Sequence, residues 1–544
     1  MAIKRFIATA DTTITNAFLE DLTNRGTGSN MGLADSLEVF SVYGQVSASA
    51  ASRFAGPATE SSGYSQEISR TLVKFPVTTA DDSANSIQAK RNSGEVPASG
   101  NVSFYLRMYN VSHHETLPVS SKVNVFAVSS SWEEGRGVDL DTYKDVTNDN
   151  EGANWMNASG SGGDWQKPGG DYWSGSADSG IKYTQTFANG NEDIEVDISE
   201  LVEQWIDGRK SNYGIGIFLT ASQEAYFSSS TGLDLSPKLS GGILHNLEGA
   251  TTSYYTKKFS ARSSEYFFKR PCIEARWDSA TKDERGTFYY SSSLATAEEN
   301  LNTLYLYNYF RGQLRNIPGV GASTIWVNIY SGSSEPAGSK LAPVPDGTHV
   351  KLKSPTTITG GCVSTGVYSA SFAMSAGATT AGGNLFDVWY GPTSVGSVEY
   401  FTGSWKPGTL SAAAAAPSTK YVSNITNIRS VYSSAETARF RIYSRLKNWN
   451  PTIYTKAVAA ASVDIVESGS YEIYRVIDDM KVVPYGTGSI LHTQMSFDIS
   501  GSYFDLDMSM LEAGYMYGIR LAYYNNSVGS WVNQPETFKF RVEN

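Results

Sequence analysis

The chain has 544 residues, of which 18% are charged and 12% are aromatic, and its formal net charge is −11. Its many aromatic and β-branched residues exclude a disordered chain, and its Lys and Arg residues form no basic patch of the kind that binds nucleic acid. The abundance of Gly, Ser, Thr and Tyr is typical of an all-β protein that is rich in turns.

The cysteine content and the start of the chain bear on where the protein is made. The two cysteines, Cys272 and Cys362, are far apart, whereas a secreted chain of this length commonly has more. The opening MAIKRFIATADTT has an apolar run that is too short for a signal peptide, and no apolar stretch reaches the roughly 18 residues of a membrane span. We therefore expect synthesis in a reducing cytosol and no membrane insertion.

The first predicted segment is residues 1–60. They combine a short helical pattern, Gly-rich turns and one apolar stretch, and this apolar content is too small for an independent core. We interpret the segment as an extended arm that adds a strand or short helix to a neighbouring subunit, with a flexible tail as the alternative. The residues expected to make this contact are Phe6, Phe18, Leu22, Met31, Leu37 and Phe40.

The next block, 61–280, has the alternation of half-buried strands. The predicted strands are RTLVKFPV (70–77), NVSFYLRMYNV (101–111), SKVNVFAVSSSW (121–132), NYGIGIFLT (212–220) and two around Pro271 in 257–277. One helix is predicted between a cap at Asp197 or Ser199 and an end at Gly208. Its buried face is expected to contain Leu201, Val202 and Trp205.

Two further blocks, 281–412 and 413–544, consist of short apolar runs between Gly and Pro turns. Runs at this regular spacing are typical of small β-sandwiches. The segment SAAAAAPS at 411–418 is the best candidate for a linker between the two blocks.

The order of the runs over about residues 66–280 resembles the DNRLRE-type jelly-roll domain, which is grouped with carbohydrate-binding modules. The resemblance rests on RTLVKFPV, SFYLRMYNV, VFAVSSSWEEG, ANW, GGDY, ISELVEQWIDGRKSNYGIGI and FSARSS…RPCIEARW, in that order. The chain departs from the pattern by an insertion at 228–256. Its leader, ITNAFLEDLTNRGTGSNMGLADSLEVFSVYGQ, and its two C-terminal blocks are similar to structural proteins of T4-like marine tailed phages.

The resemblance implies a virion structural protein without enzymatic activity, assembled in the host cytoplasm and bound to other virion proteins and to copies of itself. A fibre-like position in the neck, collar or tail is favoured. A capsid decoration protein is one alternative, and an adhesin that binds a host-surface glycan is another. The expected fold is all-β, with an N-terminal extended arm at 1–60, a jelly-roll β-sandwich with one short helix at 61–280, and two Ig-like or fibronectin-like β-sandwiches at 281–412 and 413–544.

An acidic loop at 130–155, SSWEEGRGVDLDTYKDVTNDNEGANW, is the first candidate site. Carboxylate and amide oxygens suit Ca²⁺, although the spacing is not that of an EF-hand. The candidate ligands are Asp145, Asn148, Asp149, Asn150 and Glu151, and Ca²⁺ is the one cofactor that the sequence suggests. The alternative is a hydrogen-bonded loop whose tryptophans fill the edge of the jelly roll while its acids face water.

A second candidate site is DWQKPGGDYW at 164–173, where rings and polar groups of the kind that bind sugars occur together. The candidate carbohydrate-binding residues are Trp165, Tyr172, Trp173, Asp164 and Asp171. Packing of these tryptophans against Gly turns is the alternative.

Catalytic motifs are not found in the sequence. HExxH, GxSxG and CxxC are missing, and the five histidines do not cluster. No two carboxylates are marked by their spacing as a glycosidase pair. We therefore expect no enzymatic activity.

Overall fold

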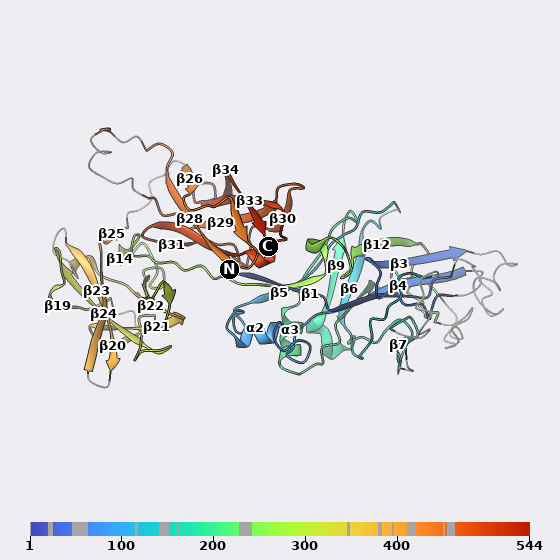
Figure 1. Cartoon of the computed structure of the whole chain (residues 1–544). Coiled ribbons are helices and arrows are strands. Elements are labelled where there is room, and N and C mark those ends of the chain that lie inside the picture. The colour runs from blue at the N-terminus through green and yellow to red at the C-terminus, as the bar shows by residue number, and fades with distance from the viewer. Residues whose placement is uncertain are drawn as a thin grey trace. The chain divides into compact units, whose positions relative to one another are not determined.

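The computed structural model describes residues 2–19, 25–45, 64–114, 118–140, 152–160, 163–227, 242–344, 349–378, 383–393, 396–410, 420–449, 452–453 and 463–544. The chain divides into two compact units, Ala2–Trp277 and Asp278–Asn544. Nearly all of their regular elements are strands (Figure 1), which confirms the prediction of an all-β, multi-domain fold. Among the described residues, no helix combines the length and the apolar composition needed to cross a membrane.

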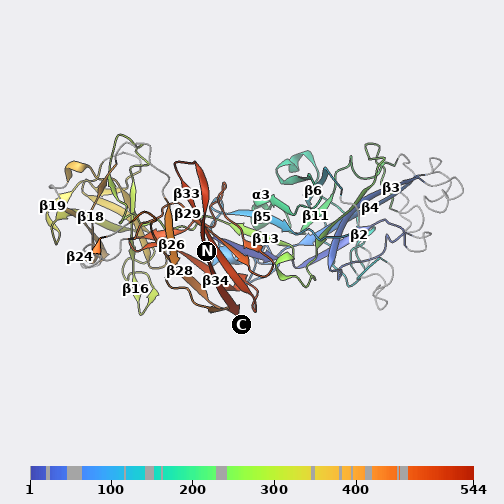
Figure 2. The same cartoon turned by 90° about the horizontal axis from the view of Figure 1, so that it is seen from above.

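The first unit is built mainly from two large antiparallel sheets. The smaller has the strand order β1 (Ile3–Ile7), β13 (Cys272–Arg276), β5 (Ser103–Met108) and β10 (Ile194–Asp197). The larger has the order β12 (Tyr254–Ser260), β3 (Ser36–Gln45), β4 (Tyr64–Lys74), β11 (Ile215–Leu219), β6 (Ser121–Ala127) and β9 (Lys182–Phe187), and β2 (Ala10–Thr15) also pairs with β4. Figures 1 and 2 both show β3 beside β4.

Alternate residues of these strands enter one core between the two sheets. Phe104 and Leu106 of the smaller sheet and Val123, Val125 and Ile217 of the larger belong to the same buried cluster. The alternation predicted in the sequence is present in β5 and β6, whereas all five residues of β11 are buried.

Two short helices flank this core. The predicted helix, α3 (Ser199–Ile206), begins where the Asp197 carboxylate accepts the Ser199 amide, and Gly208 follows its end at φ 72°. Its buried residues, Leu201, Val202 and Trp205, are those predicted. The sequence analysis missed α2 (Ile87–Asn92), whose N-cap Ser86 accepts the Ala89 amide. This helix buries only Ile87, so it has no apolar stripe to reveal it.

The expectation of a separate N-terminal arm is wrong for the described residues. Strand β1 pairs with β13 from Ile3↔Arg276 to Ile7↔Cys272, β2 pairs with β4, and β3 lies between β4 and β12. Phe6, Phe18 and Leu37 are buried in this unit, and Met31 and Phe40 are partly buried; Leu22 lies outside the described residues. The segment needs few apolar residues of its own because it joins a core shared with strands up to 273 positions away, as in the pair Ile3↔Arg276.

The second unit contains two groups of sheets. The first is a curled sheet in the order β15 (Asn302–Tyr307), β22 (Val367–Phe372), β21 (Thr357–Ser364), β18 (Ile325–Gly332), β23 (Asn384–Thr393) and β24 (Gly396–Trp405), with β19 (Ala337–Leu341) on β18 and β20 (Leu352–Ser354) on β21. Short pairs join β14 (Tyr289–Tyr290) to β25 (Gly408–Thr409) and β16 (Tyr309–Phe310) to β17 (Gln313–Leu314). The core of this group includes Phe288, Tyr368, Trp389 and Trp405.

The second group is a sandwich of two sheets. One sheet has the order β26 (Tyr421–Ile425), β28 (Thr437–Leu446), β32 (Gly501–Asp507) and β31 (Ser496–Asp498). The other has the order β27 (Val431–Ser433), β34 (Ser530–Glu543), β33 (Met516–Asn525), β29 (Gly469–Arg475) and β30 (Met480–Val483). Aromatic rings fill the space between them; Tyr471 stacks on Phe504 with centroids 3.9 Å apart.

The placement of β1 predicts that Phe6→Ala destabilises the first unit by about 3 kcal/mol, because it leaves a cavity in a packed core. The exposed Leu33→Ala should change stability by less than about 0.5 kcal/mol. Denaturant unfolding and hydrogen exchange of the β13 amides would measure both effects. Unchanged exchange in Phe6→Ala would contradict the pairing of β1 with this sheet.

Candidate functional site

The outer face of the larger sheet, opposite the main core, is also covered. Here Ile14 of β2 and Ile68 and Leu72 of β4 pack against residues of the acidic loop and of the segment after it, and together they form a second, smaller core. Its other members are Val128, Ala153, Trp155, Ala158 and Trp165. Because both faces of β4 are buried, any polar group on this strand needs a partner inside the protein.

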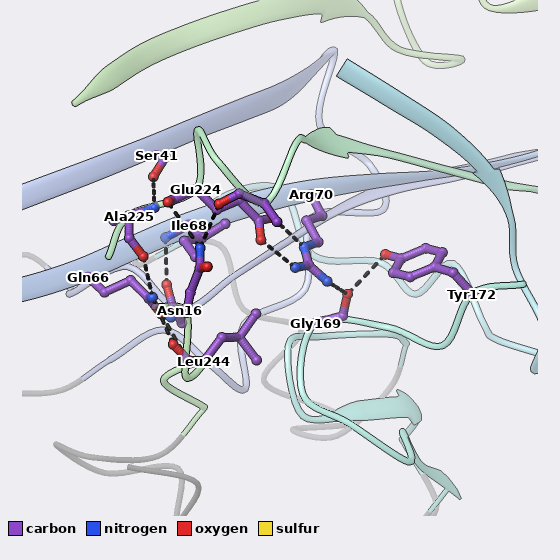
Figure 3. A network of polar contacts seen from close by, with 12 residues as sticks. Asn16, Ser41, Gln66, Ile68, Arg70, Gly169, Tyr172, Glu224, Ala225 and Leu244 are labelled. Carbon is purple, nitrogen blue, oxygen red and sulfur yellow. Dashed lines mark hydrogen bonds and ion pairs between the residues drawn. The ribbon is translucent and has the colours of Figure 1, made fainter. Parts of the chain in front are cut away.

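Arg70 of β4 lies in this second layer and is paired with Glu224 (Figure 3). Its Nε and Nη2 donate to the two carboxylate oxygens at 2.9 and 2.8 Å, which is the two-armed geometry that guanidinium groups prefer. Its Nη1 donates to the carbonyl of Gly169 at 3.0 Å, and the Tyr172 hydroxyl donates to the same oxygen at 2.9 Å. The guanidinium also lies 4.9 Å from the centre of the Phe218 ring.

Two carboxamides continue this polar network along the sheet (Figure 3). Gln66 donates to the carbonyls of Ala225 and Leu244 at 2.8 and 2.9 Å and accepts the Leu244 amide at 2.9 Å. Asn16 accepts the Ile68 amide at 2.6 Å and donates to the carbonyl of Gly242. The network of Asn16, Gln66, Arg70 and Glu224 therefore fastens β2 and β4 to the segments on either side of residues 228–241.

The five predicted carbohydrate-binding residues do not form one exposed face. Trp165 is 4% exposed and donates to the Asn154 carbonyl, and Asp171 is 8% exposed and accepts Ser130 Oγ and the Gln166 amide. Tyr172 packs on Phe218, and Trp173 lies beneath the Lys210 ammonium, 3.6 Å from the ring centre. Of the five, only Asp164 is classed as exposed, on the short strand β8 (Gly163–Asp164), which pairs with β7 (Asn157–Ser159). Sugar binding here stays a prediction, and these contacts place most of its residues in structural roles.

The described part of the acidic loop is held by an ion pair. Glu134 accepts Arg262 Nε at 3.0 Å and Nη2 at 2.8 Å, and it also accepts the Asp11 amide at 2.9 Å. Trp132 donates to the Tyr213 carbonyl, and Trp155 donates to that of Gly242. The predicted Ca²⁺ ligands, Asp145, Asn148, Asp149, Asn150 and Glu151, lie outside the described residues. Among the residues that are described, no group of three or more His, Cys, Asp and Glu side chains is placed to hold a metal ion.

Asp11, which lies beside this ion pair, has a pKa well above that of an ordinary carboxyl group. Its pKa is raised from 3.8 to about 7; burial is the largest cause and the nearby Glu134 also raises it, while the Arg262 amide, which donates to Asp11 Oδ2 at 2.5 Å, lowers it. A group with such a pKa suits proton transfer. Its oxygens face Arg262 and Glu134 inside the packed unit, so its placement indicates a structural role.

A second charged cluster lies on the outer face of the smaller sheet. Glu274 of β13 accepts Arg5 Nε at 2.9 Å and Arg276 Nη2 at 2.5 Å, and Arg276 Nη1 also donates to Glu195. Burial alone would raise the pKa of Glu274, but the adjacent guanidinium groups of Arg5, Arg276 and Arg107 lower it to about 2. Burial raises the pKa of the neighbouring Cys272 thiol to about 12, which makes it an inert side chain.

No family model and no curated protein matches the chain. Among solved structures, it is similar to a chain described under the words "Ca2+-stabilized adhesin helps an Antarctic bacterium reach out and bind ice", at 11% identity and a TM-score of 0.12. The match covers 98% of this chain and 100% of the other. At this TM-score the two backbones do not superpose as one fold, so no property is transferred from the likeness.

The residues of the polar network were missed by the sequence analysis. Arg70 begins the strand-like run RTLV, and a charged residue at this position is a weak sign of a buried charge. Its partner Glu224 lies 154 positions further along the chain. Asn16 and Gln66 stand in polar surroundings that look like ordinary turns or solvent-facing positions. Nothing in the sequence shows that these four residues meet.

Breaking the Arg70–Glu224 pair is predicted to destabilise the first unit. Arg70→Leu or Glu224→Leu leaves one unpaired buried charge, which costs about 3–5 kcal/mol, whereas Arg70→Met combined with Glu224→Met should lie closer to wild type. Thermal or denaturant unfolding of all variants would measure this. The exposed pair Arg209–Asp207 is the matched control, and its loss should cost less than about 1 kcal/mol. Equal, small losses at both pairs would contradict the burial of Arg70.

Asp11 predicts a pH dependence of stability. The folded protein holds a proton on Asp11 up to about pH 7, but the unfolded chain releases it near pH 4. The free energy of unfolding is therefore highest, as far as Asp11 determines it, below pH 4. It falls by roughly 1–3 kcal/mol as the pH rises to 7. Asp11→Asn should flatten this slope, and the exposed Asp164→Asn should not. Hydrogen exchange of the β2 amides between pH 4 and 8, corrected for intrinsic rates, would reveal either outcome.

Proposed function

We propose that the chain is a structural protein of a tailed-phage virion, without enzymatic activity, which works through contact surfaces on rigid β domains. Its partners are other virion proteins and copies of itself, and its position is in the neck, collar or tail. The similarity of the leader and of the two C-terminal blocks to structural proteins of T4-like marine tailed phages, beside the resemblance of residues 66–280 to the DNRLRE-type jelly roll, supports the class of particle. The all-β, multi-domain fold is of the kind that such a role requires.

The absence of enzymatic activity is supported by the way in which charged side chains are used. Glu224, Glu274 and Asp387 each accept a guanidinium inside the protein, at donor–acceptor distances between 2.5 and 2.9 Å. A catalytic acid or base needs access to a substrate in a cleft. These carboxylates instead fix strands to one another.

The observation that carries the proposal is an aromatic hairpin, Tyr309–Leu314, at the surface of the second unit. Strands β16 and β17 are joined by a tight turn in which Arg311 and Gly312 both have positive φ, as a two-residue hairpin turn requires. Tyr309 is 56% exposed and Phe310 is 52% exposed, and the Arg311 and Arg315 guanidinium groups lie over the Phe310 ring. Tyr, Phe and Arg on a rigid support are the residues that dominate protein–protein interfaces.

This hairpin replaces the N-terminal segment as the candidate assembly surface. Phe6 and Leu37 fill the core of their own sandwich, so they are not available to a neighbour. A capsid decoration protein would use the same kind of surface. Locating the chain in the particle distinguishes a neck, collar or tail protein from a capsid decoration protein.

The proposal predicts that the chain co-sediments with purified virions of the phage that encodes it, in a fixed ratio to the major proteins of the particle. Tyr309→Ser combined with Phe310→Ser should fold normally but be depleted from particles at least fivefold, because these two side chains supply most of the contact energy. Ile477→Ser, which removes a still more exposed apolar side chain of the same unit, is the control and should assemble normally. Density-gradient fractions analysed by quantitative mass spectrometry would measure incorporation. Recovery of the wild-type chain only in the particle-free fractions would contradict the proposal.

A further inference from the structure

A cavity of about 420 Å³ lies at one end of the C-terminal sandwich, between the β33–β34 hairpin and the ends of β26 and β28. Its volume is in the range of small-molecule binding sites. Its lining combines two lysines (Lys420 and Lys447), four carboxamides (Asn525, Asn526, Asn533 and Gln534) and three tyrosine rings (Tyr421, Tyr523 and Tyr524). None of the described residues that line it is an Asp or a Glu.

The two lysines occupy opposite positions on neighbouring strands. Strands β26 and β28 pair with Tyr421 opposite Leu446, and the Lys447 amide donates to the Lys420 carbonyl at 2.8 Å, so the register continues to this pair. Like charges directly opposite one another on a sheet destabilise it. Neither ammonium has an ion-pair partner among the described residues. An anion bound between them would remove this repulsion.

A bulge in β34 shapes the other wall. The register shifts between Arg520 and Ala522, so that Ala522 pairs with Asn533 while Arg520 pairs with Thr537. Bulges of this kind bend a strand and redirect its side chains, often beside a binding site. Gln534 and Pro535 enter the cavity lining from this bulge.

The hairpin end that closes the cavity is fixed before any ligand binds. Asn525 Oδ1 accepts both the amide and the hydroxyl of Ser527, and the amides of Val528 and Gly529 donate to the Asn525 carbonyl. The carboxamides of Asn526 and Asn533, in contrast, have no hydrogen-bond partner in the part of the chain that the structure describes. They can therefore both donate to and accept from a ligand.

Aromatic rings supply the apolar part of the site. Tyr524 is 40% exposed and meets Trp531 edge to face at 5.6 Å, and Tyr421 meets the buried Tyr523 in the same way. The Tyr523 hydroxyl is bound to Ser423 and Ser444, so this ring is a fixed base. Flat rings beside amides suit the alternating C–H faces and hydroxyl groups of a sugar.

We infer that this cavity binds an acidic oligosaccharide, with Lys420 and Lys447 at its carboxylate or sulfate group, the carboxamides at its hydroxyls and Tyr524 against a sugar ring. A simple inorganic anion would leave the amides and rings unused. A nucleic acid is disfavoured by the net charge of −11 on the chain. The inference does not depend on the proposed role in a virion, because it concerns a ligand site that a protein of any assembly could have.

Isothermal titration of the full chain with trigalacturonate and with a heparin-derived hexasaccharide tests this inference. At least one of them should bind, and methyl-esterified trigalacturonate and sodium sulfate should bind more weakly by about tenfold or more, because the first lacks the charge and the second lacks the sugar. Binding of neither saccharide, or sulfate binding as tight as that of the saccharide, would overturn the inference.

Substitutions of the lining residues test whether the saccharide binds in this cavity. Lys420→Gln combined with Lys447→Gln should weaken saccharide binding by about tenfold or more, and Tyr524→Ala should weaken it severalfold. Lys406→Gln combined with Lys539→Gln makes the same change in charge elsewhere on the second unit and should leave affinity within about twofold. Circular dichroism and thermal unfolding confirm that each variant is folded. Equal affinity of the two double variants would show that the saccharide binds elsewhere and would refute the site.

Discussion

The structure of the first unit depends on the burial of its larger sheet on both faces. One face of β4 meets the main core and the other meets a smaller core made by Trp155, Trp165 and their neighbours. A strand in this position cannot leave a polar group to solvent, and an unpaired buried charge costs several kcal/mol. Arg70 is therefore tolerated only because Glu224 accepts both arms of its guanidinium. Glu224 lies 154 positions after Arg70, so the ion pair also holds the segment around Glu224 against β4.

The same constraint explains how the described acidic residues of this unit are used. Glu134 binds Arg262, and Glu274 binds Arg5 and Arg276, each in a geometry that satisfies the carboxylate. Stable ion pairs lower the pKa of an acid and remove it from proton transfer, as in Glu274. Asp11 is the exception, because burial outweighs its contacts. Acidic residues thus serve here as connections between strands.

Local pattern predicted much of this fold. Alternation located strands such as β5 and β6, and the spacing of Leu201, Val202 and Trp205 located α3 and its buried face. Local pattern failed where stability comes from distant partners. Residues 2–45 have too few apolar side chains for a domain of their own, but β1 needs only β13 and a share of the common core. Arg70 and Glu224 could not be joined for the same reason, since no rule of spacing connects residues so far apart.

Most charged side chains described within the sheets are paired with one another. Side chains that can contact a ligand or another protein therefore lie mainly at turns and strand ends. In the hairpin at Tyr309–Leu314, a tight turn holds two aromatic rings in solvent. In the C-terminal sandwich, the hydrogen bonds of Asn525 within its own turn hold one wall of a cavity whose two lysines form no ion pair with the residues that the structure describes. Both features have backbones fixed by local hydrogen bonds, so little conformational entropy is lost when a partner binds. Rigid sheets that carry such surfaces suit a protein whose work is recognition and contact.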